Sequence, residues 1–293
     1  MINFSPRIQH LPFLFNGPTE VAVLGLHEIH PIVSGNKWYK LAPYLREAQE
    51  LGCTRIITAG GAFSNHIIAT AFAAQTAGLK SVGWIRGEES VRLSPTLEDA
   101  RKQEMELVFF QRSAYAAIDL QPGIIPGTKD YFIPAGGKGL TGVRGASTIL
   151  SSAETNSFNH IIAACGTGTM LAGLQLSAAA HQKIIGISVL NNQPEPLPTI
   201  QQHLQELGIK SIPEIFHYAY GGYAKVHPEV INLMREAWVK EKLPLDFVYT
   251  GKLFSAVQHL LRTGYFPRDA RLLLIHSGGL QGNRSLPKGS LPF

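Results

Sequence analysis

Short runs of β-branched residues alternate with helical patterns along most of this chain, and this alternation constrains the fold more than any other feature. The predicted strands, all of which except ELVFF contain glycine or proline, are RIITAGG, SVGWIRG, ELVFF, YFIPAGG, HIIAACG, KIIGISVL, DFVYTG and RLLLIHSGG. The helical patterns cover residues 37–50, 65–77, 96–104, 142–153, 169–181, 228–242 and 251–262. Strands that take turns with helices are typical of an α/β fold with a mostly parallel sheet.

The predicted strands form two groups, which indicates two α/β units. Four runs lie up to and including the segment YFIPAGGKG and the others follow it, so a boundary is expected near residues 135–155. Ligands of such proteins usually bind in a crevice outside the carboxyl ends of the strands. Functional residues are therefore expected in the polar turns that follow the strands.

Composition and charge exclude several classes of function for the 293 residues. Lys and Arg number 26 against 21 Asp and Glu, but the basic residues are scattered, so no nucleic-acid partner is expected. No segment approaches about 18 consecutive apolar residues, and no signal-peptide pattern opens the chain, so no membrane association is expected either. Cys53 and Cys165 stand far apart without a C-x-x-C or His-rich pattern, so neither a disulfide framework nor a metal site is expected. These features fit a cytoplasmic protein.

The segment HIIAACGTGTMLAG predicts a strand, a tight turn and a helix. The turn consists of Gly166, Thr167, Gly168 and Thr169. Backbone N–H groups in such a turn at a helix start bind an anion, and phosphate suits them best. Met170 and Leu171 rule out a nucleoside-triphosphate loop, and Leu171 and the lack of a later acidic residue argue against a dinucleotide fingerprint. A single terminal phosphate is the better match, although a turn of this kind can also serve simply to join a strand to a helix.

A second polar turn follows the strand RIITAGG. Ser64 is in a position to cap a helix, and Asn65 and His66 stand in its first turn. A serine cap is common, and a single histidine is more often packed or solvated than functional, so this turn alone indicates only a helix start. Together with the turn at 166–169 it could bind two anions, a phosphate and an α-carboxylate.

Lys37 stands in the polar segment SGNKWYKL at the start of the first predicted helix. The positive end of the helix dipole disfavours an ammonium group there by up to about 1 kcal/mol, so helix stability does not explain this lysine. A lysine together with a phosphate site and a carboxylate site is explained by pyridoxal 5'-phosphate, whose aldehyde forms a Schiff base with a lysine amine. The helix N-terminus then lowers the pKa of the amine toward the neutral form.

Five short motifs, SGNKWYKL, SNH, GTGT, YTGK and HSGG, occur in this order over most of the chain. In these motifs the sequence resembles the 1-aminocyclopropane-1-carboxylate deaminase and D-cysteine desulfhydrase family of pyridoxal-phosphate enzymes. The resemblance implies the tryptophan synthase β-subunit fold (fold type II), with two three-layer α/β domains and mostly parallel twisted sheets. It implies a larger cofactor-binding domain of residues 1–45 and 146–293, and a smaller domain of residues 46–145. It also implies a homodimer that acts on a small amino acid.

The resemblance assigns roles to the matching residues. Lys37 corresponds to the Schiff-base lysine, which also carries a proton. Asn65 corresponds to the residue that bonds the cofactor's ring hydroxyl, and Ser64 to the residue that holds the substrate carboxylate. The residues assigned to the phosphate are Gly166, Thr167, Gly168 and Thr169. Tyr249 in DFVYTGK and Tyr223 in YGGYAKVHPE match tyrosines near the reacting carbon, although tyrosines beside glycine turns often serve only in packing.

Two positions favour the desulfhydrases over the deaminases. The residue after the active-site tyrosine faces the pyridine nitrogen in this family. The deaminases carry Glu there and Leu in the final His-Leu-Gly-Gly, whereas the desulfhydrases carry small hydroxyl residues at both positions. This chain has Thr250 and Ser277 at these positions. A hydroxyl only hydrogen-bonds the pyridine nitrogen of the cofactor, so it makes the ring a weaker electron sink than a carboxylate does. A weaker sink suffices for D-cysteine, because sulfide leaves and the negative charge need not accumulate on the ring. The sequence therefore predicts α,β-elimination to pyruvate, sulfide and ammonia.

Other interpretations stay open at this point. Phe63 and Tyr39 replace the Gln and the basic residue that are usual in the family, which leaves room for another amino-acid substrate. The alternatives are deamination of 1-aminocyclopropane-1-carboxylate to 2-oxobutanoate and ammonia, and a cofactor-binding protein with little turnover. A nicotinamide-dependent dehydrogenase is disfavoured by Leu171 and the missing acidic residue, and a metal hydrolase by the dispersion of the 11 His residues.

Overall fold

The computed structural model describes residues 5–15, 17–118, 120–189, 196–222 and 224–293, and the chain divides into two compact units. Unit 1 comprises residues 1–36 and 146–293, and unit 2 comprises residues 37–145. This division differs from the predicted one by residues 37–45, which belong to unit 2. Their place there is fixed by contacts such as the hydrogen bond from the Tyr44 hydroxyl to the carbonyl of residue 138, at 2.8 Å.

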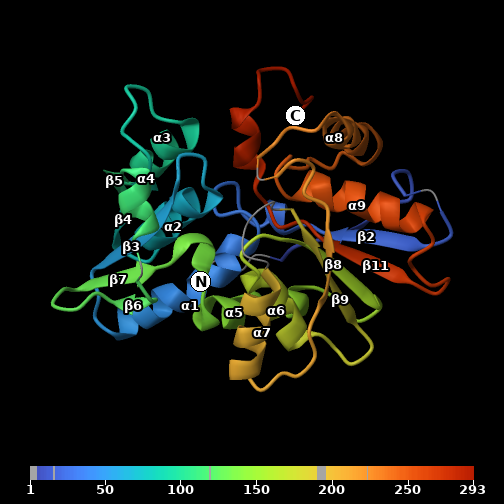
Figure 1. Ribbon diagram of the computed structural model, residues 1–293, viewed down its shortest axis with the longest axis horizontal. Coiled ribbons are helices and arrows are strands. Elements are labelled where there is room, and N and C mark those ends of the chain that lie inside the picture. Colours follow the sequence, from blue (N-terminus) through green and yellow to red (C-terminus); the bar gives the residue numbers. More distant parts are fainter. Residues whose placement is uncertain (1–4, 16, 119, 190–195, 223) are drawn as a thin grey trace. The chain divides into compact units, whose positions relative to one another are not determined.

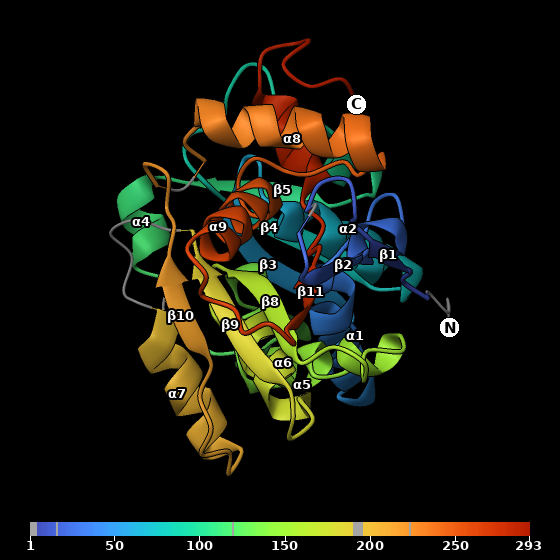
Figure 2. The same ribbon diagram turned by 90° about the vertical axis from the view of Figure 1, so that its right-hand side faces the viewer.

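Unit 1 is built on a six-stranded sheet in the order β1-β2-β11-β8-β9-β10 (Figures 1 and 2). Its strands are β1 (Ile8–His10), β2 (Glu20–Leu24), β8 (His160–Cys165), β9 (Lys183–Ser188), β10 (Glu214–His217) and β11 (Arg271–Ile275). β1 pairs antiparallel with β2, and the other described pairs are parallel. β8 is buried along nearly its whole length, which explains its continuous apolar sequence HIIAAC.

Helices cover both faces of the unit 1 sheet. They are α6 (Thr169–Ser177), α7 (Pro196–Glu206), α8 (Pro228–Glu241) and α9 (Thr250–Arg262). Figures 1 and 2 show α8 and α9 on one side of the sheet and α6 and α7 on the other. The core beneath α9 contains Phe254 and Val257 of the helix and Ile162 of β8, all wholly buried. Short 3₁₀-helices are formed by Leu26–Glu28, Leu150–Ser152 and Leu280–Ser285.

Unit 2 contains a five-stranded sheet in the order β5-β4-β3-β7-β6. Its strands are β3 (Arg55–Gly61), β4 (Lys80–Arg86), β5 (Glu106–Phe110), β6 (Gly123–Ile124) and β7 (Asp130–Ile133), and only β6 pairs antiparallel among the described pairs. Its helices are α1 (Asn36–Glu50), α2 (Asn65–Thr76), α3 (Pro95–Lys102), α4 (Arg112–Ala116), the 3₁₀-helix Ala135–Gly137 and most of α5 (Leu140–Ala146). None of the helices in the described residues combines the length and the hydrophobicity that a membrane span requires.

The predicted α/β class with mostly parallel sheets is confirmed, but one predicted strand is wrong. Residues 247–249 of DFVYTG form a turn, and α9 begins at Thr250. The carboxylate of Asp246 accepts hydrogen bonds from the backbone N–H groups of residues 248, 249 and 250. These local bonds cap the helix and override the β propensity of Phe, Val and Tyr.

Candidate active site

The start of α1 lies against the turn that follows β11. The backbone N–H of Asn36 donates a hydrogen bond to the carbonyl of Ser277 at 3.1 Å. Gly35 has a φ of +74°, and a Cβ atom at this position would lie 1.9 Å from the Ser277 carbonyl oxygen. Only glycine permits this approach, which fixes the peptide immediately before Lys37 beside the turn at Ser277.

The predicted phosphate loop lies between β8 and α6. Gly168 caps α6 with a φ of +81°, and the hydroxyls of Thr167 and Thr169 lie 3.1 Å apart. The cap residue has no side chain to bond the first-turn N–H groups of the helix, so these groups can hold an anion. The side-chain amide of Asn36 donates to the Met170 sulfur at 3.1 Å, which joins the start of α1 to the start of α6.

Tyr249 approaches the same loop from the start of α9. A Cβ atom on Gly166 would lie 3.3 Å from Cε1 of the Tyr249 ring, so the ring packs directly on the loop backbone. Asp246 positions the tyrosine, because its Oδ2 accepts the Tyr249 N–H at 2.8 Å. Within unit 1 the structure thus brings together the phosphate loop, Tyr249, Ser277 and the peptide before Lys37.

The two hydroxyl residues predicted near the cofactor ring have different surroundings. Thr250 is wholly buried, and its hydroxyl accepts the Asp246 N–H and donates to the Asp246 carboxylate, both at 2.7 Å. Its only proton therefore goes to Asp246. Ser277 is half-buried, and its backbone rather than its hydroxyl makes the contact with Asn36. The roles of Thr250 and Ser277 toward the cofactor ring stay predictions.

The predicted carboxylate site opens α2 in unit 2. The hydroxyl of Ser64 accepts the backbone N–H of His66 at 3.3 Å, so the predicted helix cap is confirmed. The side-chain oxygen of Asn65 is buried and has no hydrogen-bond partner within the described part of the chain. A buried acceptor without a donor costs folding free energy. A bound ligand with a hydroxyl group would donate a hydrogen bond to this atom and remove that cost.

His66 is a neutral, buried residue close to Lys37. Its Nε2 lies 2.8 Å from the Thr58 hydroxyl, which itself donates to the carbonyl of Ile133 at 2.7 Å. Nε2 must therefore carry the proton and donate to Thr58. Burial lowers the pKa of His66 well below its usual value, and the positive charges of Lys37 and Lys40 lower it further. An uncharged ring here adds no positive charge next to Lys37.

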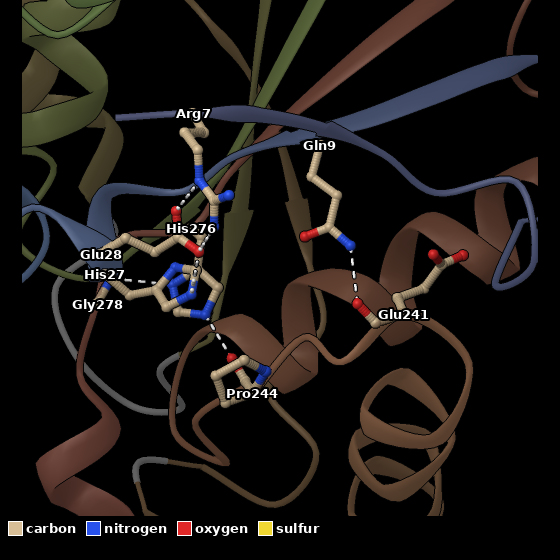
Figure 3. A network of polar contacts seen from close by, with 8 residues as sticks. All are labelled: Arg7, Gln9, His27, Glu28, Glu241, Pro244, His276 and Gly278. Carbon is tan, nitrogen blue, oxygen red and sulfur yellow. Dashed lines mark hydrogen bonds and ion pairs between the residues drawn. The ribbon is translucent and has the colours of Figure 1, made fainter. Parts of the chain in front are cut away.

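A second buried histidine, His276, fixes the turn that contains Ser277. Its Nε2 donates to the carbonyl of Pro244 at 2.7 Å, and its Nδ1 accepts the backbone N–H of Gly278 at 3.2 Å (Figure 3). Because Nδ1 accepts this bond, the ring is neutral, and burial lowers its pKa. The ring of His27 lies on it with a centroid distance of 3.9 Å. His276 thus joins the turn after β11 to the segment that leads to Asp246.

Three buried residues of this region were not predicted from the sequence, namely Asp246, Lys252 and His276. An Asp four residues before a Thr at a helix start is a capping signal, and it could have identified Asp246. Lys252 and His276 belong to the motifs YTGK and HSGG, but the motifs alone do not indicate that the two side chains are buried and bonded to the backbone. Tyr223 lies outside the described residues, so its predicted role stays a prediction.

Comparison with known proteins finds relatives along most of the chain. Residues 27–278 match the family described as pyridoxal-phosphate dependent enzymes. Over 276 residues the chain is 31% identical to a candidate 1-aminocyclopropane-1-carboxylate deaminase of Pyrococcus horikoshii, covering 85% of this chain and 81% of the relative. It is 27% identical to a mitochondrial bifunctional D-cysteine desulfhydrase and 1-aminocyclopropane-1-carboxylate deaminase of Arabidopsis thaliana, across 85% of this chain and 70% of the relative.

The fold also matches solved structures. The crystal structure of a homologue of 1-aminocyclopropane-1-carboxylate deaminase has a TM-score of 0.82 and 29% sequence identity, and the match covers 96% of this chain and 91% of the other. This match confirms the predicted fold.

The close approach at Gly35 predicts an asymmetry between two glycines of similar conformation. Gly52 has a φ of +68° and no atom within 4 Å of an added Cβ, so Gly52→Ala should cost only about 1 kcal/mol of unfolding free energy. Gly35→Ala must also displace the Ser277 carbonyl and should cost about 3 kcal/mol or more. Urea unfolding of both variants measures the difference, and equal losses would contradict the backbone contact.

The buried His27 predicts a loss of stability in acid. Burial lowers the pKa of His27 to about 2, and His276 and Arg7 add to the effect. Below about pH 6.5 the unfolded chain binds a proton that the folded chain rejects, so stability is full above this pH and decreases as the pH falls. The loss from this residue reaches about 2 kcal/mol at pH 5.

Urea unfolding at pH 7 and pH 5 tests the contribution of His27. His27→Gln should reduce the difference in unfolding free energy between the two pH values by about 2 kcal/mol. His217→Gln, at an exposed position, is the control and should leave the difference unchanged. A His27→Gln variant with the pH dependence of the unmodified protein would show that His27 is not held neutral.

Proposed function

Because the chain belongs to the pyridoxal-phosphate dependent enzymes that include the 1-aminocyclopropane-1-carboxylate deaminases, we propose that it catalyses α,β-elimination on D-cysteine. The products are pyruvate, sulfide and ammonia. Deamination of 1-aminocyclopropane-1-carboxylate to 2-oxobutanoate and ammonia is the second candidate, and the names of the relatives favour it. The relative from Arabidopsis thaliana is named for both activities, so the two reactions are compatible with one protein framework.

The residues of this chain fit pyridoxal phosphate. The loop that ends at the Gly168 cap presents first-turn N–H groups of α6, which suit the phosphate. The buried side-chain oxygen of Asn65 lacks a donor, which the ring hydroxyl of the cofactor would supply. Lys37 stands at the second position of α1, directly after the peptide that contacts Ser277. When bound, the cofactor links to an amine and withdraws electrons from the substrate carbon that carries the amino group.

The proposed work of the protein is to hold the substrate and move protons. Ser64 and the first-turn N–H groups of α2 bind the substrate carboxylate. The Lys37 amine removes the proton from the α carbon, and the sulfur then leaves the β carbon with its bonding electrons and takes up a proton. The resulting enamine adds water to give pyruvate and ammonia. Tyr249 stands beside the phosphate loop and is the proposed proton donor near the reacting atoms.

The residues at two positions favour elimination from D-cysteine over opening of the cyclopropane ring. Thr250 and Ser277 stand where the deaminases carry Glu and Leu. Thr250 donates its proton to Asp246, so a hydroxyl from Ser277 is the proposed partner of the ring nitrogen. A hydroxyl stabilises a protonated nitrogen less than a carboxylate does, which suits a reaction in which the negative charge departs with the sulfide.

The proposal is tested by product analysis with the cofactor-loaded protein. D-cysteine should give equal amounts of sulfide and pyruvate, at a rate well above that for 1-aminocyclopropane-1-carboxylate. Faster formation of 2-oxobutanoate from the cyclopropane substrate would establish the second candidate instead. If neither substrate is converted while the cofactor is bound, the substrate assignment is wrong.

The role of Lys37 is tested by borohydride reduction followed by peptide mass spectrometry. A pyridoxyl group should be fixed on Lys37, and Lys37→Ala should lose both this label and about 10³-fold or more of kcat. Lys80→Ala, at an exposed lysine of the same unit, is the control and should keep both. Labelling of a different lysine would remove Lys37 from its proposed role.

The Ser277 hydroxyl should support the turnover of D-cysteine. Ser277→Leu removes the proposed hydroxyl partner and should lower kcat/KM for D-cysteine by about tenfold. Ser277→Thr keeps the hydroxyl and should stay within about threefold of the unmodified protein. Equal activity of the Leu and Thr variants on D-cysteine would contradict the electron-sink argument.

A further inference from the structure

α9 carries a lysine, Lys252, that the proposed reaction does not use and whose side chain is wholly buried. Its Nζ donates hydrogen bonds to the carbonyl oxygens of Gly222 at 2.6 Å and Ala219 at 2.7 Å, and a longer one to Val189 at 3.5 Å. The three N–H bonds of an ammonium group thus meet three carbonyls. No carboxylate in the described part of the chain forms an ion pair with Lys252, so backbone dipoles compensate its charge.

Two of these carbonyls belong to a turn with an unfavourable backbone conformation. In the turn formed by residues 219–222, Tyr220 has a φ of +47° and Gly222 a φ of +113°. A tyrosine in the left-handed region needs support from its surroundings. The Tyr220 hydroxyl lies 2.7 Å from the hydroxyl of Ser255, which stands three residues after Lys252 on α9. Residues three apart share one face of a helix, so one face of α9 holds the turn at both points.

The third carbonyl connects Lys252 to the candidate site. Val189 follows β9, and its backbone N–H donates to the carbonyl of Cys165 at 3.4 Å, directly before the phosphate loop. α9 itself begins after Tyr249. In the sequence, Tyr223 follows immediately after Gly222. Lys252 therefore links the helix that follows one predicted active-site tyrosine to the turn that precedes the other.

We propose that Lys252 is a positioning residue whose buried ammonium acts as a built-in monovalent cation among backbone carbonyls. It fixes the turn at residues 219–222, which directly precedes Tyr223 in the sequence, against the start of α9. This role rests on the proposed function, because the turn it holds precedes a proposed active-site residue. Burial lowers the pKa of Lys252 to about 8, with Asp246 opposing this effect, so the charged form predominates near neutral pH.

Two variants of the cofactor-loaded protein, Lys252→Ala and Lys252→Met, test the proposal. Lys252→Ala opens a space lined by carbonyls, which a small cation can enter. Lys252→Met keeps the length of the side chain and fills that space with an apolar group. Both variants should lose about tenfold or more of kcat for D-cysteine while they retain the bound cofactor. Lys210→Ala, at an exposed lysine, is the control and should keep the kcat of the unmodified protein.

Chemical rescue distinguishes positioning by a cation from simple packing. Methylammonium, ammonium or potassium ions should restore kcat of Lys252→Ala in a saturable manner, by about fivefold or more, whereas tetramethylammonium at equal ionic strength should not. Lys252→Met should respond to none of them. Absence of any cation effect on Lys252→Ala, or a Lys252→Met variant with unchanged kcat, overturns the proposal.

Two further measurements test the role of Lys252 even if Lys252→Ala does not fold alone or the protein does not convert D-cysteine. If Lys252→Ala does not fold alone, refolding is carried out in methylammonium and in tetramethylammonium, and equal yields overturn the proposal. If the unmodified protein converts no D-cysteine, the proposed function fails by itself. Lys252 is then tested through the unfolding temperature of the Lys252→Ala holoenzyme, which methylammonium should raise and tetramethylammonium should not.

Discussion

One backbone contact between distant segments organises the candidate site. The N–H of Asn36 meets the carbonyl of Ser277, and Gly35 makes the approach possible because it has no Cβ. Through this contact the end of β11 and the start of α1 become neighbours, and Asn36 extends the link to Met170 beside the phosphate loop. A larger residue at position 35 would separate segments whose combination is the basis of the proposed chemistry.

Around this contact the buried charged and titratable groups are satisfied mostly by the backbone. Asp246 accepts three N–H groups at the start of α9, Lys252 donates to three carbonyls, and His276 uses both ring nitrogens on main-chain atoms. A buried polar group is tolerated only when its hydrogen bonds are made, and main-chain partners are held rigidly by the sheet and the helices. The result is a set of loops with fixed geometry, which suits residues that must stand at set distances from a cofactor and a substrate.

Much of the tryptophan synthase β-like fold could be predicted because its signals are local. The central strands β3, β8 and β11 are continuous apolar runs, and most helices begin or end at capping, glycine or proline residues. β2 and β10 were missed although glycine or proline flanks them, because such short apolar runs do not distinguish a strand from other structure. DFVYTG was predicted as a strand because propensity does not include a buried aspartate that binds the backbone ahead of it.

The sequence by itself determined the α/β class, the glycine turn at residues 166–169, the serine cap of α2 and the lysine at the start of α1, because each depends on residues close to it in the chain. Only the tertiary structure decided which of these meet. It set the glycine turn beside Tyr249 and the start of α1 beside Ser277. It also buried Lys252 among three carbonyls from two other parts of the chain. Such contacts join residues far apart in sequence, and their geometry arises only when the packed sheet and helices bring the segments together.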